Sequence, residues 1–352
     1  MRYSETDSRP LWFEAPTRIA RGIHAYRNRI LIIVQNQTNT WRNRLAIDEI
    51  GAGVALLTLC LAIWAATGDR FIEPSNLLKV ARQASSYGIM SVGMVILMSM
   101  GEIDLSVGSI LTLVNVVTAI ALREELPMPL AVAIGLGSGA ACGLANGLLS
   151  VLLGIPTIII TLGTMSVFRG LALVLSNAKP IGNFSKDNLL FSLGSGDILG
   201  IPTSVCVMLL VCLAGYILLG RTAFGWRVQA IGSNAQAARF SGIPIARYRI
   251  AALALMGLVA GIAGIMELAF LQTGSTTTGQ GYELYVIAAA IIGGTALTGG
   301  SGSVVGGVLG ALMIAVIRNG LVLLELSAYW GTVVTGAVII GAVAVSNLVK
   351  RR

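Results

Sequence analysis

Long apolar stretches recur along this chain and restrict its fold more than any other feature. A helix needs roughly 20 mostly apolar residues to cross the hydrocarbon of a bilayer, and backbone groups in lipid find partners only within regular structure. Ten such stretches are present, at 51–67, 84–100, 105–122, 130–153, 156–176, 202–219, 250–271, 284–298, 304–320 and 330–348. The sequence therefore predicts an all-α polytopic membrane protein with about ten transmembrane helices.

The composition supports this class. Only 11% of the residues are charged and the mean hydropathy is +0.82, whereas soluble domains carry roughly a quarter charged residues. This excludes a soluble enzyme, a nucleic-acid-binding domain and a disordered regulator, so membrane lipid is an expected partner and nucleic acid is not. The 43 glycines against 8 phenylalanines indicate closely packed helices.

Basic residues predict the orientation. Sixteen of the 24 Lys and Arg residues lie in the first fifty residues, in 221–249 and in 350–352, and basic loops stay in the cytoplasm. Ten crossings place all three regions on one side, so both termini are predicted to be cytoplasmic in a multi-pass protein of the cell (inner) membrane. The opposite side receives 177–201, with Lys179, Lys186, Asp187 and Asp197.

These boundaries define the domains. Residues 1–50 form a basic segment, either cytoplasmic or lying on the membrane surface, without the long apolar run of a signal peptide. Residues 51–349 form the transmembrane domain, with a cytoplasmic loop at 220–249. Residues 350–352 form a basic cytoplasmic tail.

Two of the connections are unusually short. A polar turn at 101–104 separates the second and third stretches, and a glycine cluster separates the eighth and ninth. Both predict broken or re-entrant helices, because non-helical backbone at membrane depth must be buried in protein or face water. Residues 101–109 also align without gaps with 293–301, which indicates either an internal repeat, as transporters often have, or chance similarity among glycines.

The first break contains two acidic residues, which are functional candidates by default inside a membrane. Glu102, Asp104, Ser106 and Gly108 are predicted to form either a structural turn, with Asp104 capping the next helix, or the mouth of a pathway. We favour the structural turn. Arg169 and Glu267 are further charges within apolar stretches, and the sequence assigns them no partner.

The loop at 220–249 contains a helix signal of its own. Asn234 is predicted to cap a short helix that runs to about Phe240, and Gly242 with Pro244 ends it. Ala235, Ala237 and Ala238 give this helix a smooth face that fits a partner's groove. These features fit two interpretations: a helix that transmits force between subunits, and an ordinary loop helix.

Four segments taken together resemble the permease subunits of ribose-type sugar ABC importers: 101–109, 230–243, 279–284 and 292–302. The resemblance extends from about residue 50 to the end. It implies a second permease copy, as a homodimer, a separate cytoplasmic ATPase, and a periplasmic or extracellular sugar-binding protein. It also implies an ATPase-coupling role for Gly232, Asn234, Gln236, Ala237, Ala238, Arg239 and Gly242. Many ABC importers have Glu where this chain has Gln236, so no fixed ion pair is expected there.

A neutral monosaccharide or polyol needs hydroxyl and amide partners in its pathway. The polar residues on apolar stretches that meet this need are Asn115, Asn146, Thr157, Thr161, Thr164 and Gln272. Polar groups within helix bundles also tie helices together, so both roles remain open for them.

The chain lacks the motifs of an enzyme. A P-loop needs Gly-x-x-x-x-Gly-Lys-Ser/Thr, which is absent, so ATP with Mg²⁺ is expected on the partner ATPase. The four cysteines lie in apolar runs and His24 is the only histidine, so we expect neither a catalytic set nor a metal site. The alternative function is a proton- or sodium-coupled secondary transporter of a small polar solute, with Glu102, Asp104 and Glu267 as the relay. An intramembrane enzyme is the least supported class.

Overall fold

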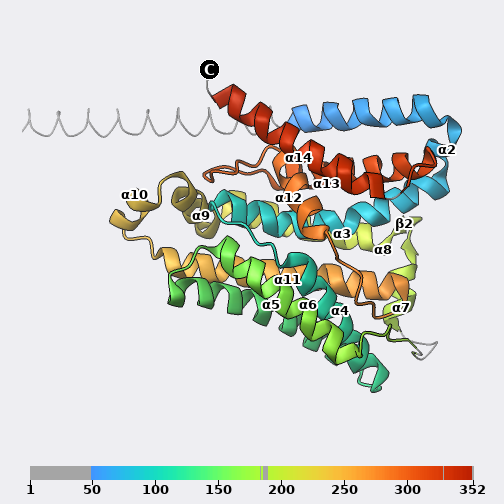
Figure 1. Ribbon diagram of the computed structural model, residues 1–352, viewed down its shortest axis with the longest axis horizontal. Helices are drawn as coiled ribbons and strands as arrows, with labels where there is room; N and C mark the ends of the chain where they lie inside the picture. Colours follow the sequence, from blue (N-terminus) through green and yellow to red (C-terminus); the bar gives the residue numbers. More distant parts are fainter. Residues whose placement is uncertain (1–48, 183, 185–188, 328, 351–352) are drawn as a thin grey trace, which may run out of the picture. The chain divides into compact units, whose positions relative to one another are not determined.

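The computed structural model describes residues 49–350 except 183, 185–188 and 328 (Figure 1). The predictions for residues 1–48, for Lys186 and Asp187, and for the last two residues of the tail fall outside the described residues. Within them the chain is helical apart from one two-stranded hairpin, so the predicted all-α class is confirmed.

Each of the ten predicted stretches contains a helix. These helices are Glu49–Thr67, α3 (Pro74–Ser99), α4 (Val107–Arg123), α5 (Met128–Leu153), α6 (Thr157–Ser176), α8 (Thr203–Arg221), α11 (Ile245–Leu271), α12 (Tyr282–Ile292), α13 (Val304–Leu323) and α14 (Tyr329–Lys350). The connections contain α2 (Asp69–Ile72), α7 (Leu189–Ser195), the antiparallel hairpin β1 (Asp197–Ile198) and β2 (Ile201–Pro202), α9 (Ala223–Ser233) and α10 (Ala235–Phe240).

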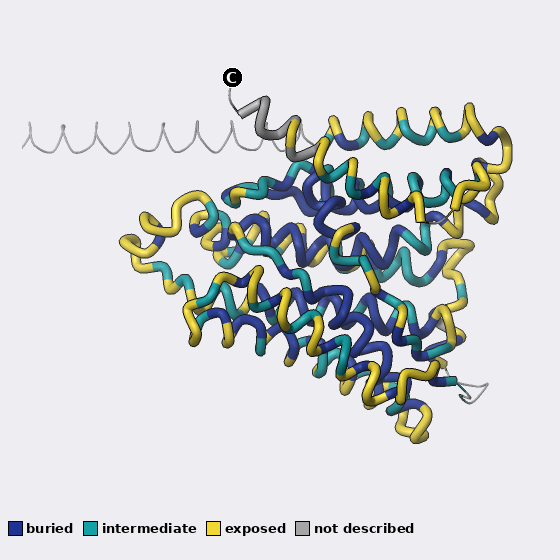
Figure 2. Tube along the Cα trace, in the orientation of Figure 1, coloured by how far each residue is buried: buried dark blue, intermediate teal, exposed yellow. Residues whose placement is uncertain are grey.

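Six of the helices in the described part are long and apolar enough to cross a membrane: Glu49–Thr67, α5, α6, α8, α11 and α13. The helices α4 and α12 and the stretch Tyr329–Gly341 of α14 are apolar but shorter. The remaining long helix, α3, is buried along most of its length among other helices (Figure 2). The total of ten crossings stays a prediction.

Proline sets where several helices begin. Pro74 is the first residue of α3, and Pro127, Pro156, Pro202 and Pro244 immediately precede α5, α6, α8 and α11. Proline suits these positions because its fixed φ favours the first turn and its missing N–H would be unpaired there anyway. Both α3 and α11 start well before the predicted stretches because apolar content marks the lipid-crossing part of a helix and not its first residue.

Glycine allows the helices to approach closely, as the composition predicts. Gly139, Gly143 and Gly147 recur at every fourth position on one face of α5, and that face packs on α11. A Cβ on Gly143 would overlap the Leu253 carbonyl, and one on Gly257 would overlap the Gly139 carbonyl. This is the small-residue seam by which membrane helices bring their backbones together.

The two predicted breaks, residues 100–106 and 293–303, lie against each other. Each follows a helix that ends in a Schellman motif, with left-handed glycines at Gly101 (φ 84°) and Gly294 (φ 87°). The amide of Gly300 in the second break donates to the carbonyl of Ser99 at 2.9 Å. The equivalent left-handed glycines are thus Gly101 and Gly294, whereas the gap-free alignment of the sequence pairs Gly101 with Gly293. The second break is also longer than the first, so α13 starts later than that alignment requires.

Candidate functional site at the helix breaks

The loop between α8 and α11, residues 222–244, lies at the end of the helix bundle opposite α2, α7 and the hairpin (Figure 1). Its local structure is as predicted. Asn234 Oδ1 accepts a hydrogen bond from the Ala237 amide at 2.9 Å and starts α10, which ends at Phe240. Gly242 follows with φ 80°, a left-handed conformation that disfavours residues with a Cβ. We call this segment the α9–α10 loop.

Most of α10 is exposed, including Asn234, Gln236, Ala237 and Arg239 (Figure 2). Ala238 is the exception, since it is buried at 5% exposure and so anchors α10 to its own chain. The sequence-based list of coupling residues omits two exposed aromatic side chains of this loop, Phe240 at 81% and Trp226 at 57% exposure. Aromatic residues are enriched at protein–protein interfaces, a signal that this list did not use.

The α9–α10 loop is packed directly onto both breaks through Gly232. A Cβ at Gly232 would overlap the carbonyl of Ser99 at the end of α3 and would meet the amide of Gly300 at 2.5 Å. Gly232 is therefore a contact point between α9 and the two breaks, and its side of the loop is not free to bind another protein.

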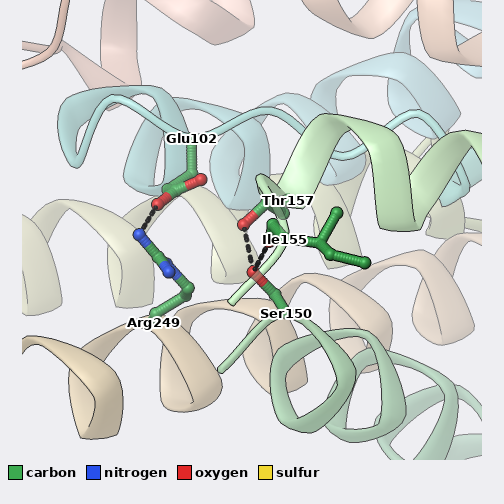
Figure 3. Close-up of polar contacts among 5 residues, drawn as sticks. All are labelled: Glu102, Ser150, Ile155, Thr157 and Arg249. Carbon is green, nitrogen blue, oxygen red and sulfur yellow. Dashed lines mark hydrogen bonds and ion pairs between the residues drawn. The ribbon is translucent and has the colours of Figure 1, made fainter. Parts of the chain in front are cut away.

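The other end of the loop reaches the first break through an ion pair. Arg249 Nη2, in the first turns of α11, lies 2.6 Å from Glu102 Oε1 (Figure 3). The side chains are 29% and 14% exposed, respectively. Gly232 in the loop and Arg249 just after it therefore contact residues 99–102 at two separate points.

Asp104 is fully buried and fixes the turn before α4. Its Oδ1 accepts hydrogen bonds from the Ser106 amide at 2.7 Å and the Ser106 hydroxyl at 2.6 Å. The N-cap residue of α4 is Ser106, and Asp104 accepts the amide of this residue, so the predicted structural turn is present, with Asp104 bound to the amide at the start of α4. The contact is an Asx turn one step before the helix, because a short carboxylate reaches the amide two residues on.

Further polar contacts join this turn to α5 and α6. Asn146 Nδ2 on α5 donates to Ser106 Oγ at 2.8 Å, and the Leu105 amide donates to Thr161 Oγ1 on α6 at 3.1 Å. Ser150 on α5 donates to the Ile155 carbonyl and lies 3.2 Å from Thr157 Oγ1 at the start of α6 (Figure 3).

Four of the six predicted pathway residues are almost fully buried, at 0–1% exposure: Asn115, Asn146, Thr157 and Thr161. Asn115 bonds the Gly264 carbonyl on α11 and the Ser275 amide. These contacts support the alternative role, that of helix–helix ties. Thr164 is half-buried and bonds its own helix, and Gln272 is an exposed, left-handed residue at the end of α11.

The start of α12 gathers the charges for which the sequence assigned no partner. Arg169 Nη1 donates to the Thr276 carbonyl at 3.2 Å and the Thr278 carbonyl at 3.4 Å. Glu267 Oε1 accepts from Ser86 at 2.6 Å. Gly108 packs on this region, because its Cβ would overlap the Gly279 carbonyl. Residues 272–281, a segment of turns and bends that leads from the end of α11 to α12, supply the partners of Arg169, and apolar periodicity does not reveal this segment.

A helical bundle with several helices long and apolar enough to cross a membrane, two partly buried breaks and a capped loop packed against them is the arrangement of a polytopic transport protein. Residues 76–343 match the permease family described as "Branched-chain amino acid transport system / permease component". The chain belongs to this permease family.

Several curated relatives match along nearly their whole length. The chain is 40% identical to the ribose import permease protein RbsC of Escherichia coli (strain K12) over 84% of this chain and 92% of the relative. It is 37% identical to RbsC of Bacillus subtilis (strain 168), over 87% and 96%, respectively. It is 36% identical to the D-allose transport system permease protein AlsC of E. coli (strain K12), over 86% and 93%.

These matches confirm the resemblance to ribose-type permeases and the prediction of a multi-pass protein of the inner membrane. No solved structure matches the chain.

Proposed function

We propose that this chain is the membrane-spanning permease subunit of an ATP-driven ABC importer for a monosaccharide or related polyol. The observation that carries the proposal is its identity of 36–40% to ribose and allose permeases over at least 84% of its length. The family description names branched-chain amino acids, so membership in the family does not by itself define the cargo. The ribose and allose relatives favour a sugar.

Two copies of the chain form the pathway, and a separate chain binds ATP with Mg²⁺. A periplasmic or extracellular binding protein delivers the sugar, and this chain neither hydrolyses ATP nor holds a cofactor. Ten crossings place the α9–α10 loop and both termini in the cytoplasm, which the distribution of basic residues supports. Exposed apolar side chains on α5, α6 and α8, among them Leu152, Val174 and Leu210, support contact with lipid and with the second copy.

In this proposal α10 docks into the ATPase, and the force reaches the pathway through the two contacts of the loop with residues 99–102. Gly232 transmits it from α9 and the Arg249–Glu102 pair from α11. The exposed Phe240 and Trp226 form the apolar part of the docking surface. Ala238 keeps α10 attached to the permease.

Uptake into vesicles tests the class. Right-side-out vesicles that contain the permease with its ATPase, and that have the binding protein outside, should accumulate radiolabelled sugar only with ATP in the lumen, on the ATPase side. Vesicles with the permease alone should show none above empty vesicles. Accumulation by the permease alone in response to a proton or sodium gradient would overturn the proposal in favour of a secondary transporter.

Docking is tested separately with Phe240→Asp in the full transporter. We expect the permease to insert normally, the ATPase to co-purify at a reduced level, and uptake to fall about 5- to 150-fold, because loss of one exposed anchor costs about 1–3 kcal/mol at an interface. Leu199→Asp is the matched control, since Leu199 is 98% exposed at the other end of the bundle. Equal effects of the two variants on ATPase retention would contradict the docking role.

A further inference from the structure

The first break contains a buried carboxylate with one oxygen that accepts two hydrogen bonds and one that accepts none within the described chain. Asp104 is 0% exposed, and its Oδ1 accepts two hydrogen bonds from Ser106. Its Oδ2 is buried and finds no hydrogen-bond partner among the described residues. Asp104 forms no ion pair with another described residue, and Arg249 of α11 is paired with Glu102.

A second unpaired atom lies in the same network. Asn146 Nδ2 donates to Ser106 Oγ at 2.8 Å, while Asn146 Oδ1 is buried and lacks a donor in the part of the chain described. The Ser106 hydroxyl has one proton, which it donates to Asp104 Oδ1 at 2.6 Å, and in this arrangement its oxygen accepts from Asn146 Nδ2. The opposite amide orientation would pair Asn146 Nδ2 with an ionised Asp104, and the infrared experiment below distinguishes the two.

One proton satisfies both unpaired atoms. We propose that Asp104 is a neutral carboxylic acid whose Oδ2–H donates to Asn146 Oδ1, closing a ring of hydrogen bonds through Asn146, Ser106 and Asp104. In the ring, Asn146 Nδ2–H donates to Ser106 Oγ, Ser106 O–H to Asp104 Oδ1, and Asp104 Oδ2–H back to Asn146. Each side-chain atom then has the partner that its chemistry requires.

The surroundings favour the neutral acid. An ionised carboxylate with no cation beside it is among the most costly groups to bury, whereas a neutral acid that donates and accepts is not. The titratable groups on the elements packed around this break are Glu102 in the break itself, Arg123 on α4, Cys142 on α5, Arg169 on α6, Arg247, Tyr248, Arg249 and Glu267 on α11, and Tyr282, Glu283 and Tyr285 on α12. None of these arginines forms an ion pair with Asp104 among the described residues: Arg249 is paired with Glu102, Arg123 with Glu124, and Arg169 binds the Thr276 and Thr278 carbonyls.

The ring of hydrogen bonds holds the first break against α5. It holds the turn that contains Ser106 against Asn146, while Leu105 is held to α6. The inference goes beyond the proposed function and does not depend on the identity of the cargo.

Infrared spectroscopy of the full-length permease in lipid nanodiscs tests the protonation directly. The chain contains six aspartates, and Asp104 is the fully buried one among those that the structure describes. We expect at neutral pH a carbonyl stretch of a protonated acid that shifts when aspartate carboxyls carry ¹³C and is missing in Asp104→Asn. Labelling separates Asp104 from partly buried glutamates such as Glu267. The absence of an aspartate-dependent band in the wild-type protein would overturn the proposal, even if no variant folds.

Variants test the ring. Asp104→Asn keeps one donor and one acceptor, so its half-life in detergent at a fixed elevated temperature should stay within about twofold of wild type, much less than the loss of a buried hydrogen bond. Asn146→Leu leaves the acid without its acceptor and should shorten this half-life roughly tenfold. Ser109→Ala is the control, because the Ser109 hydroxyl is also buried without a partner in the described residues. Destabilisation by Asp104→Asn equal to that by Asp104→Ala, or a larger loss in Ser109→Ala than in Asn146→Leu, would overturn the ring.

Discussion

The two breaks in the bundle connect consecutive helices in similar ways but are held in place by different interactions. Both leave a helix through a Schellman motif, and both precede a helix whose N-cap is a serine, Ser106 or Ser303. The first break holds its shape with polar side chains, through Glu102 and Asp104. The second holds its shape by close backbone contact, since a Cβ on Gly293 would overlap the backbone of Gly306.

This difference indicates which property each break depends on. Polar side chains fix a segment through directional bonds, so the first break should respond to changes in charge and hydrogen bonding. Close backbone packing tolerates no added atoms, so the second should respond to side-chain size. Gly232 contacts both breaks and links them to the α9–α10 loop.

The largest effect is expected from added volume in the second break. Gly293→Val places side-chain atoms where the backbone of Gly306 now lies, and backbone cannot move aside as a side chain can. We expect a loss of stability of about 3 kcal/mol or more, the upper part of the range for overpacking. The measurement is the yield of monodisperse protein in detergent and its thermal unfolding. Gly163→Val on α6 is the control, since a Cβ there meets no described atom within 4 Å; equal damage from both would show that the break has no special need for glycine.

The next effect is expected at the contact between the loop and the breaks. Gly232→Val should leave a membrane-inserted permease but reduce ATP-driven uptake at least tenfold, about 1.4 kcal/mol or more of coupling, because α9 is pushed away from Ser99 and Gly300. ATP hydrolysis and uptake are measured together in the full transporter. Gly220→Val, at the end of α8 and without a described atom within 4 Å of its Cβ, serves as the matched variant. Uptake and hydrolysis that fall in proportion in Gly232→Val would count against a coupling role.

The sequence predicts the elements of the fold better than their meeting points. All ten apolar stretches contain a helix, and Asn234 starts α10 as its side-chain chemistry indicates. The convergence of Ser99, Gly232 and Gly300 is not predictable by these means, because glycine gives no periodic signal and the contacts join residues far apart in the chain. Residues 101–104 show a second limit of prediction from sequence. Their polar side chains predict a turn, whereas the choice of Ser106 as N-cap of α4 depends on its φ and ψ angles.

The first break should respond to charge. Glu102→Gln removes an ion pair that is largely but not fully buried, so we expect a cost of about 1–2 kcal/mol, between values for exposed and buried pairs. Uptake should fall several-fold with normal insertion. The double variant Glu102→Arg with Arg249→Glu should recover part of this loss, since it restores opposite charges in the same place. A double variant worse than the sum of the two single variants would mean that the orientation of the pair, and not its existence, matters.

The smallest effect is expected at the start of α10, because a cap supports a short exposed helix without holding the breaks. Asn234→Ala removes the bond to the Ala237 amide and should cost about 0.5–1 kcal/mol, which weakens binding of the ATPase about two- to fivefold in a titration with the purified permease. Asn234→Ser retains a capping oxygen and should bind nearly as well as wild type. If serine binds as weakly as alanine, the Asn234 amide contacts the ATPase itself, and its role is recognition at the surface instead of preorganisation of α10.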